Sequence, residues 1–201
     1  MIAIVDYGMG NLRSVSKALE HLGAKVSVTS SPRDILKADK VVLPGVGAFG
    51  DAVEGLKTNA LLDPLREYIK LGKPFLGICL GLQLLFHESE ESPSITGLDV
   101  YSGKVQGFRS RGVKVPHMGW NQIHKNTDHP LLRNIPDESY FYFVHSFYAA
   151  PQDASVTAAT CEYGQEKFAV AVGKDHVFAT QFHPEKSQKA GLNLLQNFVK
   201  W

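Results

Sequence analysis

A cysteine between two glycines, where a strand-like run becomes a helix-like one, most constrains what this chain can fold into. The segment 73–86 reads KPFLGICLGLQLLF. Up to Ile78 it is a compact apolar run introduced by Gly72 and Pro74, which predicts a short buried strand. From Leu80 onward the residues are good helix formers, so a helix is predicted to follow directly.

The spacing Gly77-x-Cys79-x-Gly81 has the form of a nucleophile elbow with cysteine in place of serine. A sharp turn crowds the backbone on both sides of the nucleophile, so the flanking positions need residues without a β-carbon. The turn would also place the thiol at a helix N-terminus, where the dipole favours the thiolate. A buried structural cysteine on a core strand is the alternative, because free cysteine is among the most buried residue types. The local pattern leaves both interpretations open.

The whole chain has the size and composition of a soluble globular protein. Its 201 residues predict one domain spanning 1–201, and the 44% hydrophobic and 20% charged content is ordinary. The apolar runs are too short to span a bilayer, and no export signal precedes the first strand-like run, so a cytoplasmic location is predicted. A net charge of +1 gives no pull toward nucleic acid or a membrane surface.

Two cysteines, Cys79 and Cys161, could pair in principle. Nothing in the sequence indicates an oxidising compartment, so an intracellular enzyme with one working thiol is favoured. The eight histidines and two cysteines form no CxxC or HxxxH cluster, and we therefore predict no metal site.

The first half alternates strand and helix patterns. Strands are predicted at 2–5, 25–29, 40–43 and 74–78, with helices at 12–22 and 51–71, the second broken near Asn59 and before Pro64. This order predicts a parallel sheet with helices on both faces. The Gly8-x-Gly10 pair lacks the third glycine of a dinucleotide fingerprint, so a tight turn is favoured over a nucleotide site.

In such sheets ligands bind at the carboxyl ends of the strands, where residues 8–11, 44–50 and Cys79 are predicted to lie. The segment 44–50 contains three glycines, which leave backbone N–H groups free to hold an anion, as an oxyanion hole requires. A plain flexible connection is the alternative.

The second half is predicted to be rich in strands. They fall at 100–108, 122–123, 140–144, 156–160, 168–172 and 177–182, and could add antiparallel strands to the sheet edge. A last helix follows, with Ser187 as its predicted cap. The basic segment 109–114 is favoured as a solvated edge over a binding site.

The last strand leads into His183-Pro184-Glu185. Two residues apart in an extended segment, His183 and Glu185 would project to the same side, and Pro184 biases His183 toward that backbone. A carboxylate beside an imidazole fixes its tautomer and stabilises its protonated form. With Cys79 this supplies nucleophile, base and orienter. An exposed surface turn is the alternative. The presence of this motif in the same chain as the elbow cysteine and the glycine loop favours a catalytic role.

These residues resemble a known family. Residues 74–83 (PFLGICLGLQ) with His183-Pro184-Glu185 resemble the class I (triad) glutamine amidotransferases. More narrowly, the chain is similar to the glutaminase subunits of imidazole glycerol phosphate synthase in residues 44–47 (PGVG), 116–121 (PHMGWN), 143–146 (FVHS) and 183–187 (HPEKS). The resemblance implies an α/β, flavodoxin-like fold: a central, mostly parallel sheet flanked by helices, with added antiparallel strands in the C-terminal half.

The resemblance also implies roles for individual residues. Cys79 would attack the glutamine side-chain amide to give a γ-glutamyl thioester, with His183 as acid and base and Glu185 orienting it. The oxyanion hole would comprise the N–H of Leu80 and one from the loop of Gly45, Val46 and Gly47. Glutamine would contact Gly47, Gln83, Ser146 and Phe147. No cofactor is implied.

A partner is implied as well, a (β/α)8 cyclase subunit that receives the ammonia. That subunit would make imidazole glycerol phosphate and an aminoimidazole carboxamide ribonucleotide in histidine biosynthesis. The implied interface comprises Asn11, Met118, Trp120, Asn121 and Lys186. From the residues alone, Trp120 in a turn-like segment would sooner be a core residue. His117 and His145 have no carboxylate at a neighbouring same-face position and are predicted to be structural or substrate-side residues.

Three other functions remain open at this point. One is the glutaminase subunit of another synthase, of the anthranilate or aminodeoxychorismate type. Another is a stand-alone cysteine hydrolase of similar fold. The third is a binding module that has lost catalysis, which the complete set of Cys79, His183 and Glu185 disfavours.

Overall fold

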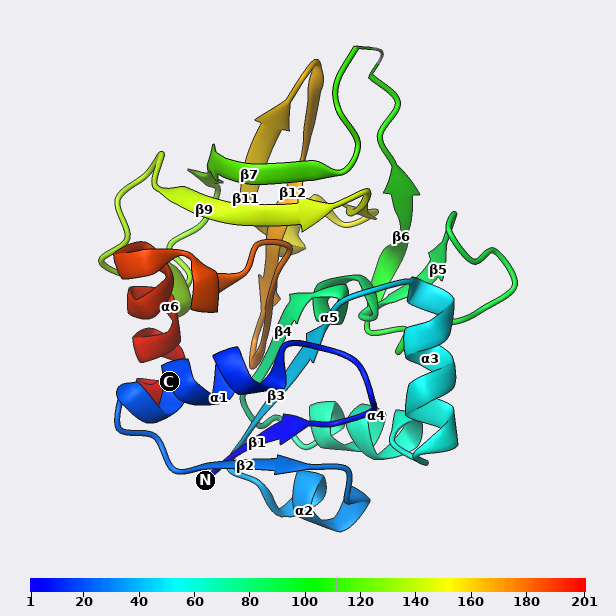
Figure 1. The fold of residues 1–201 in the computed structure, drawn as a ribbon, viewed down its shortest axis with the longest axis vertical. Helices are drawn as coiled ribbons and strands as arrows, with labels where there is room; N and C mark the ends of the chain where they lie inside the picture. Colours follow the sequence, from blue (N-terminus) through cyan, green and yellow to red (C-terminus); the bar gives the residue numbers. More distant parts are fainter. Residues whose placement is uncertain (111) are drawn as a thin grey trace.

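An eight-stranded sheet forms the centre of the computed structural model, which describes residues 1–110 and 112–201 (Figure 1). Arg111, in the basic segment, lies outside the described residues. Five strands are mutually parallel, in the order β2 (Val26–Thr29), β1 (Ile2–Val5), β3 (Lys40–Gly45), β4 (Phe75–Cys79) and β13 (Val177–Thr180). The sheet continues antiparallel through β12 (Glu166–Lys174), β11 (Thr157–Tyr163) and β8 (His124–Lys125). The predicted fold class is confirmed.

Helices cover both faces of this sheet (Figure 1). One face carries α1 (Leu12–His21) and α6 (Gln188–Lys200), and the other carries α2 (Pro32–Lys37), α3 (Phe49–Thr58) and α4 (Leu62–Lys70). Successive side chains of a strand point to opposite faces, so β1 contributes to both cores. Ile2 and Ile4 pack with α1 and α6, whereas Ala3 and Val5 pack with α2, α3 and α4.

Two smaller sheets lie beside the main one. A three-stranded sheet contains β10 (Phe147–Pro151), β6 (Tyr101–Gly107) and β5 (Phe86–Ser89). A two-stranded antiparallel ribbon pairs β7 (His117–Gln122) with β9 (Tyr140–His145). The short 3-10 helices are η1 (Pro130–Leu132), η2 (Ala154–Val156) and η3 (Pro184–Lys186). The backbone bond from His183 N to Tyr142 O, 3.0 Å, ties the start of η3 to the ribbon.

The helix after Cys79 is much shorter than predicted. It is a single turn, α5 (Leu80–Gln83), and the chain then enters β5 at Phe86. The reason lies in distant backbone: Leu98 N donates to Leu84 O at 2.7 Å, and Val100 N donates to Leu85 O at 2.8 Å. The carbonyls of Leu84 and Leu85 therefore accept hydrogen bonds from residues 98 and 100 and cannot extend the helix by a second turn. Tertiary hydrogen bonds thus override helix propensity.

Other predictions need correction too. Strand β3 runs on to Gly45, so the predicted glycine loop is reduced to Val46–Ala48 before α3 begins. The segment 116–121 is largely strand, not a turn. The six-residue helix α2 lies between β2 and β3, where the sequence indicated an optional helix without bounds, because it is too short to show a periodic apolar pattern.

Among the described residues, no helix is both long enough and apolar enough to cross a membrane. The same residues contain no group of three or more His, Cys, Asp or Glu side chains arranged to hold a metal ion.

Candidate active site

Cys79 occupies the sharp turn between β4 and α5. Its φ of +55° with ψ of −106° is a conformation that side chains other than glycine rarely adopt. The flanking glycines are required sterically. A β-carbon on Gly77 would lie 2.7 Å from the carbonyl oxygen of Gly81, and one on Gly81 would collide with the carbonyl oxygen of Leu43. The turn thus has the geometry predicted from the spacing.

His183 reaches the same edge of the sheet from the neighbouring parallel strand. Thr180 at the end of β13 pairs in register with Ile78 of β4, and His183 follows three residues later. The Nδ1 of His183 lies 2.8 Å from Oε1 of Glu185, and the two side chains are 2% and 1% exposed. His183 has an extended backbone, but Glu185 lies in η3, so the extended geometry predicted for the pair is wrong for its second member.

The Ser187 side chain supports this turn. Its Oγ donates to the carbonyl oxygen of His183 at 2.6 Å and accepts the N–H of Tyr142 at 3.0 Å. Ser187 does occupy the predicted N-cap position of α6, but its side chain makes no cap bond to the helix. The hydroxyl therefore holds the backbone of the base against β9.

The protonation of His183 is set by its two neighbours. Burial alone would lower its pKa, but the interactions with Cys79 and the hydrogen-bonded Glu185 outweigh burial and raise the pKa from 6.5 to about 10. A ring in this position carries its proton readily at neutral pH. The Cys79 Sγ itself points toward Val144 O, 4.0 Å away, and accepts a hydrogen bond from Gln181 Nε2 at 3.7 Å.

A cavity of about 380 Å³ opens at Cys79. It is lined by Val46, Gly47, Cys79, Leu80, Gln83, Glu91, Pro116, Val144, His145, Ser146 and Phe147. The structure therefore brings together six other residues to which the family resemblance assigned a role in the oxyanion hole or in glutamine binding. Gly45 lies just behind, paired with Cys79 in the β3–β4 register.

The predicted oxyanion segment is tightly constrained on one side and open on the other. A β-carbon on Gly45 would lie 2.5 Å from the Tyr7 hydroxyl, which donates to the Pro44 carbonyl oxygen at 3.0 Å. Val46 is 39% exposed and Gly47 has a φ of +102°. Gly45 is thus packed, whereas Val46 and Gly47 lie toward solvent.

Gln83 is anchored within the protein as well as lining the cavity. Its Nε2 donates to Phe147 O at 3.0 Å and to Gln181 Oε1 at 3.1 Å. Both amide hydrogens are therefore used, and it is the carbonyl end of Gln83 that can serve a ligand.

Several residues of the site were missed by sequence reasoning. Glu91 is the one carboxylate among the described residues lining the cavity, and its Oε2 accepts the N–H of Phe49 at 2.7 Å. It sits in an acidic stretch that gives no signal of a site. Gln181 is fully buried next to the Cys79 sulfur. An isolated glutamine after a strand likewise gives no sequence signal of a site residue.

The residues assigned to a partner interface differ in how they are presented. Met118 and Trp120 are 61% and 46% exposed on the outer face of β7. Lys186 is exposed and its Nζ lies 5.8 Å from the ring centroid of Tyr142. Asn11 caps α1 by accepting from Ser14 N at 3.3 Å. Asn121 turns its amide inward, and its interface role stays a prediction.

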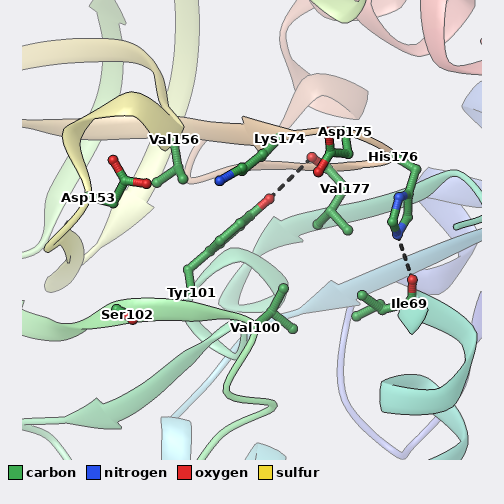
Figure 2. A pocket seen from close by; sticks show the side chains of 10 residues that line it. All are labelled: Ile69, Val100, Tyr101, Ser102, Asp153, Val156, Lys174, Asp175, His176 and Val177. Atoms are coloured by element: carbon green, nitrogen blue, oxygen red, sulfur yellow. Dashed lines mark hydrogen bonds between the residues drawn. The ribbon is translucent and has the colours of Figure 1, made fainter.

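A second cavity, of about 300 Å³, lies at the opposite edge of the sheet (Figure 2). It opens beside the start of β13 at Val177, which pairs with Phe75 at the start of β4. Tyr101 donates to Val177 O at 3.4 Å across it, and Lys174 and Asp175 stand at its rim. Its described lining includes no cysteine, so the chemistry predicted from the sequence belongs to the cavity at Cys79.

Cys161 has no comparable setting. Both cysteines are free, and burial raises the pKa of the Cys161 thiol to about 12. An inert thiol in the core is the expected result.

Comparison with known proteins gives one consistent family. The model of the family "Glutamine amidotransferase class-I" matches residues 3–201. A protein of Acinetobacter baylyi is 51% identical over 202 residues, covering 100% of this chain and 98% of its own. One from Synechococcus elongatus is 52% identical over 98% of this chain and 92% of its own, and one from Chlorobaculum tepidum is 48% identical over 100% of both. All three are named imidazole glycerol phosphate synthase subunit HisH.

Solved structures agree on the fold. A glutamine amidotransferase crystal structure superposes with a TM-score of 0.77 at 18% identity, covering 100% of both chains. A chain of PurLQS from Thermotoga maritima superposes with a TM-score of 0.76 at 19% identity, covering 99% of this chain and 97% of that one. At such identities the likeness concerns the fold alone.

Proposed function

Because this chain belongs to the class I glutamine amidotransferases and, within them, to the HisH subunits of imidazole glycerol phosphate synthase, we propose that it hydrolyses glutamine at Cys79, His183 and Glu185. One observation carries the assignment of these residues. The strained Cys79 turn and the buried His183–Glu185 pair come from two adjacent parallel strands and meet at one edge of the sheet, beside a cavity.

The reaction follows from this arrangement. The Cys79 sulfur attacks the amide carbon of the glutamine side chain while His183 already holds the proton, as its raised pKa requires. The resulting oxyanion accepts hydrogen bonds from Leu80 N–H and from an N–H of the Gly45–Gly47 segment. His183 then protonates the departing nitrogen, so ammonia leaves and a γ-glutamyl thioester remains. Water, deprotonated by His183, attacks the thioester, and glutamate and the free thiol are released.

Glu185 positions the base in both halves of this cycle. Its carboxylate accepts the Nδ1 hydrogen of His183, which leaves Nε2 for proton transfer and stabilises the imidazolium. Within the described residues, Nε2 of His183 is buried without a regular hydrogen bond. A bound substrate would supply that partner.

The cavity also suggests how the amino-acid end of glutamine is held. A zwitterionic end needs an anion for its ammonium group and N–H donors for its carboxylate. We assign the first role to Glu91, whose second carboxylate oxygen is free of the Phe49 contact. Ser146, between β9 and β10, and Phe147, the first residue of β10, would contact the rest, with the carbonyl end of Gln83.

The partner in this proposal is a (β/α)8 cyclase subunit, which would use the ammonia to make imidazole glycerol phosphate. Met118 and Trp120 on the outer face of β7, with Lys186, Asn11 and Asn121, would form the interface. Exposed aromatic and Met side chains are typical anchors of such contacts. No nucleic acid or membrane takes part, and a cytoplasmic location would be tested by cell fractionation.

The decisive experiment replaces Cys79 by Ala in the complex with the cyclase subunit. Glutamine-dependent synthesis should fall by at least about a thousandfold, because the covalent step is lost. Synthesis supplied with ammonium salt should be unchanged, since the cyclase does not need the thiol. Cys161→Ala is the matched control and should leave both activities intact. Glutamine-dependent synthesis by Cys79→Ala would overturn the assignment.

A further inference from the structure

His117 and His145 are buried next to the site, and the proposed reaction uses neither. His117 Nδ1 lies 3.0 Å from His145 Nε2, and His145 Nδ1 lies 2.9 Å from the carbonyl oxygen of Phe147. At the other end, Asn121 Nδ2 lies 3.3 Å from His117 Nε2. These contacts form one line running from strand β7 into the cavity wall.

The hydrogen-bond partners at the two ends of this line determine which ring nitrogen of each histidine carries a proton. The carbonyl of Phe147 can only accept, so His145 carries its proton on Nδ1 and accepts at Nε2. His117 must then donate from Nδ1 and accept at Nε2.

The orientation of the Asn121 amide agrees independently. Its Nδ2 donates to Glu162 O at 2.9 Å and its Oδ1 accepts Gln122 N at 2.8 Å, so Nδ2 is the atom facing His117. Only neutral histidines satisfy all the contacts. Burial lowers the pKa of His117 to about 4 and that of His145 to about 3, which keeps both neutral.

The line continues from Phe147 to the nucleophile. The same Phe147 carbonyl accepts from Gln83 Nε2, whose other hydrogen goes to Gln181 Oε1. Gln181 Nε2 is then left to donate to the Cys79 sulfur at 3.7 Å. Gln181 is itself locked by its backbone N–H, which donates to Val170 O at 2.8 Å.

We propose that this hydrogen-bond chain, from Asn121 through the two neutral histidines to Gln181, positions Cys79 and ties it to strand β7. His117, His145 and Gln181 are positioning residues in this scheme, and the inference rests on the proposed glutaminase function. Strand β7 carries Met118 and Trp120 on its outer face and His117 and Asn121 on its inner face. A partner seated on the outer face would therefore act directly on the first members of the chain.

Two substitutions at His117 separate this role from simple packing. The ring stacks on Phe143 and Tyr163, at centroid distances of 4.8 and 4.2 Å. His117→Phe keeps the stacked ring and removes the donor. His117→Asn loses the stack but keeps a donor at the Nδ1 position, which can reach His145.

In the complex with the cyclase subunit and its ligand, His117→Phe should lower kcat for glutamine about tenfold, with KM changed less than about threefold. His117→Asn should stay within about threefold of the wild type in kcat. A packing role predicts the reverse order. Wild-type kcat in His117→Phe, or an equal loss in His117→Asn, would overturn the proposal. Size-exclusion chromatography verifies that each complex is assembled, and unchanged ammonium-dependent synthesis verifies that its cyclase subunit is active.

A second measurement does not depend on any variant. In the assembled wild-type complex, ¹⁵N NMR of the imidazoles should show His117 and His145 as neutral Nδ1–H tautomers at pH 7. An Nε2–H tautomer or a charged ring at either position would contradict the proposed hydrogen-bond chain. Failure of the glutaminase proposal is recognised separately, by glutamine use in Cys79→Ala, and leaves the tautomer result standing.

Discussion

Single residues at this site combine backbone strain with buried charge. A non-glycine residue in the conformation of Cys79 costs on the order of 1–3 kcal/mol, which the surrounding sheet must supply. The same turn aims the sulfur into the cavity instead of the core. His183 and Glu185 are buried as a pair, which is favourable only because each satisfies the other.

The raised pKa of His183 predicts how stability depends on pH. The pKa is about 10 in the folded protein and 6.5 in the unfolded chain, so the folded state binds the proton more tightly. This stabilisation is fully present below pH 6.5 and is lost as pH rises through about 10. The difference in unfolding free energy between wild type and His183→Asn should therefore shrink by on the order of 1–3 kcal/mol from pH 6 to pH 10.

Chemical denaturation at several pH values measures this difference. The loss should be smaller when both proteins also carry Cys79→Ala, because one of the two groups that raise the pKa is then missing. A difference that is constant or grows with pH would contradict the assigned protonation.

At the scale of elements, the site depends on how closely α5 approaches β3. Gly81 lets the single turn of α5 lie against the carbonyl of Leu43, where no β-carbon fits. Gly45 on β3 likewise lets Tyr7 and Leu80 approach the predicted oxyanion segment. Two β-strands and a helical turn thus converge on a volume that only glycines leave open.

Gly81→Ala should consequently destabilise the protein by about 2–3 kcal/mol, since the clash is with backbone that cannot move aside. Gly107→Ala in β6 is the matched control. There the added β-carbon would meet only the Phe147 ring, at 3.5 Å, so a change below about 1 kcal/mol is expected. Urea denaturation compares the two, and equal stabilities would show that α5 can shift away from β3.

At the scale of the whole molecule, the sheet edge that carries the triad is also the edge beneath the β7–β9 ribbon. His183 N donates to Tyr142 O on the ribbon, and the outer face of the ribbon presents Met118 and Trp120. A partner on that surface would contact elements that hold the base, the nucleophile and the cavity wall. The family membership and this layout together disfavour a stand-alone hydrolase.

We accordingly expect the purified chain alone to be at least about tenfold slower in glutamine hydrolysis than its complex with the liganded cyclase subunit. We infer that the exposed Val46 and Gly47 peptides adopt more than one orientation and that a partner selects the one that holds the oxyanion. Steady-state glutaminase assays with and without the partner test this. Full turnover by the chain alone would show that the oxyanion hole is already formed.

The sequence by itself determined the elements whose signals are local. Apolar runs and glycines located β1, β3, β4 and β13, and the spacing around Cys79 predicted its strained turn. The pairing of His183 with Glu185 was also predictable, because the two residues are near neighbours in the chain.

Only the tertiary structure decided the rest, because it depends on partners far away in the chain. The backbone N–H groups of Leu98 and Val100 end α5 after one turn, and no sequence pattern near Cys79 predicts these hydrogen bonds. Gln181 comes to lie under the sulfur of a residue 102 positions earlier, and His117 meets His145 across 28 positions. A local sequence pattern encodes local conformation. Hydrogen bonds between distant segments are determined only when the sheet brings those segments together.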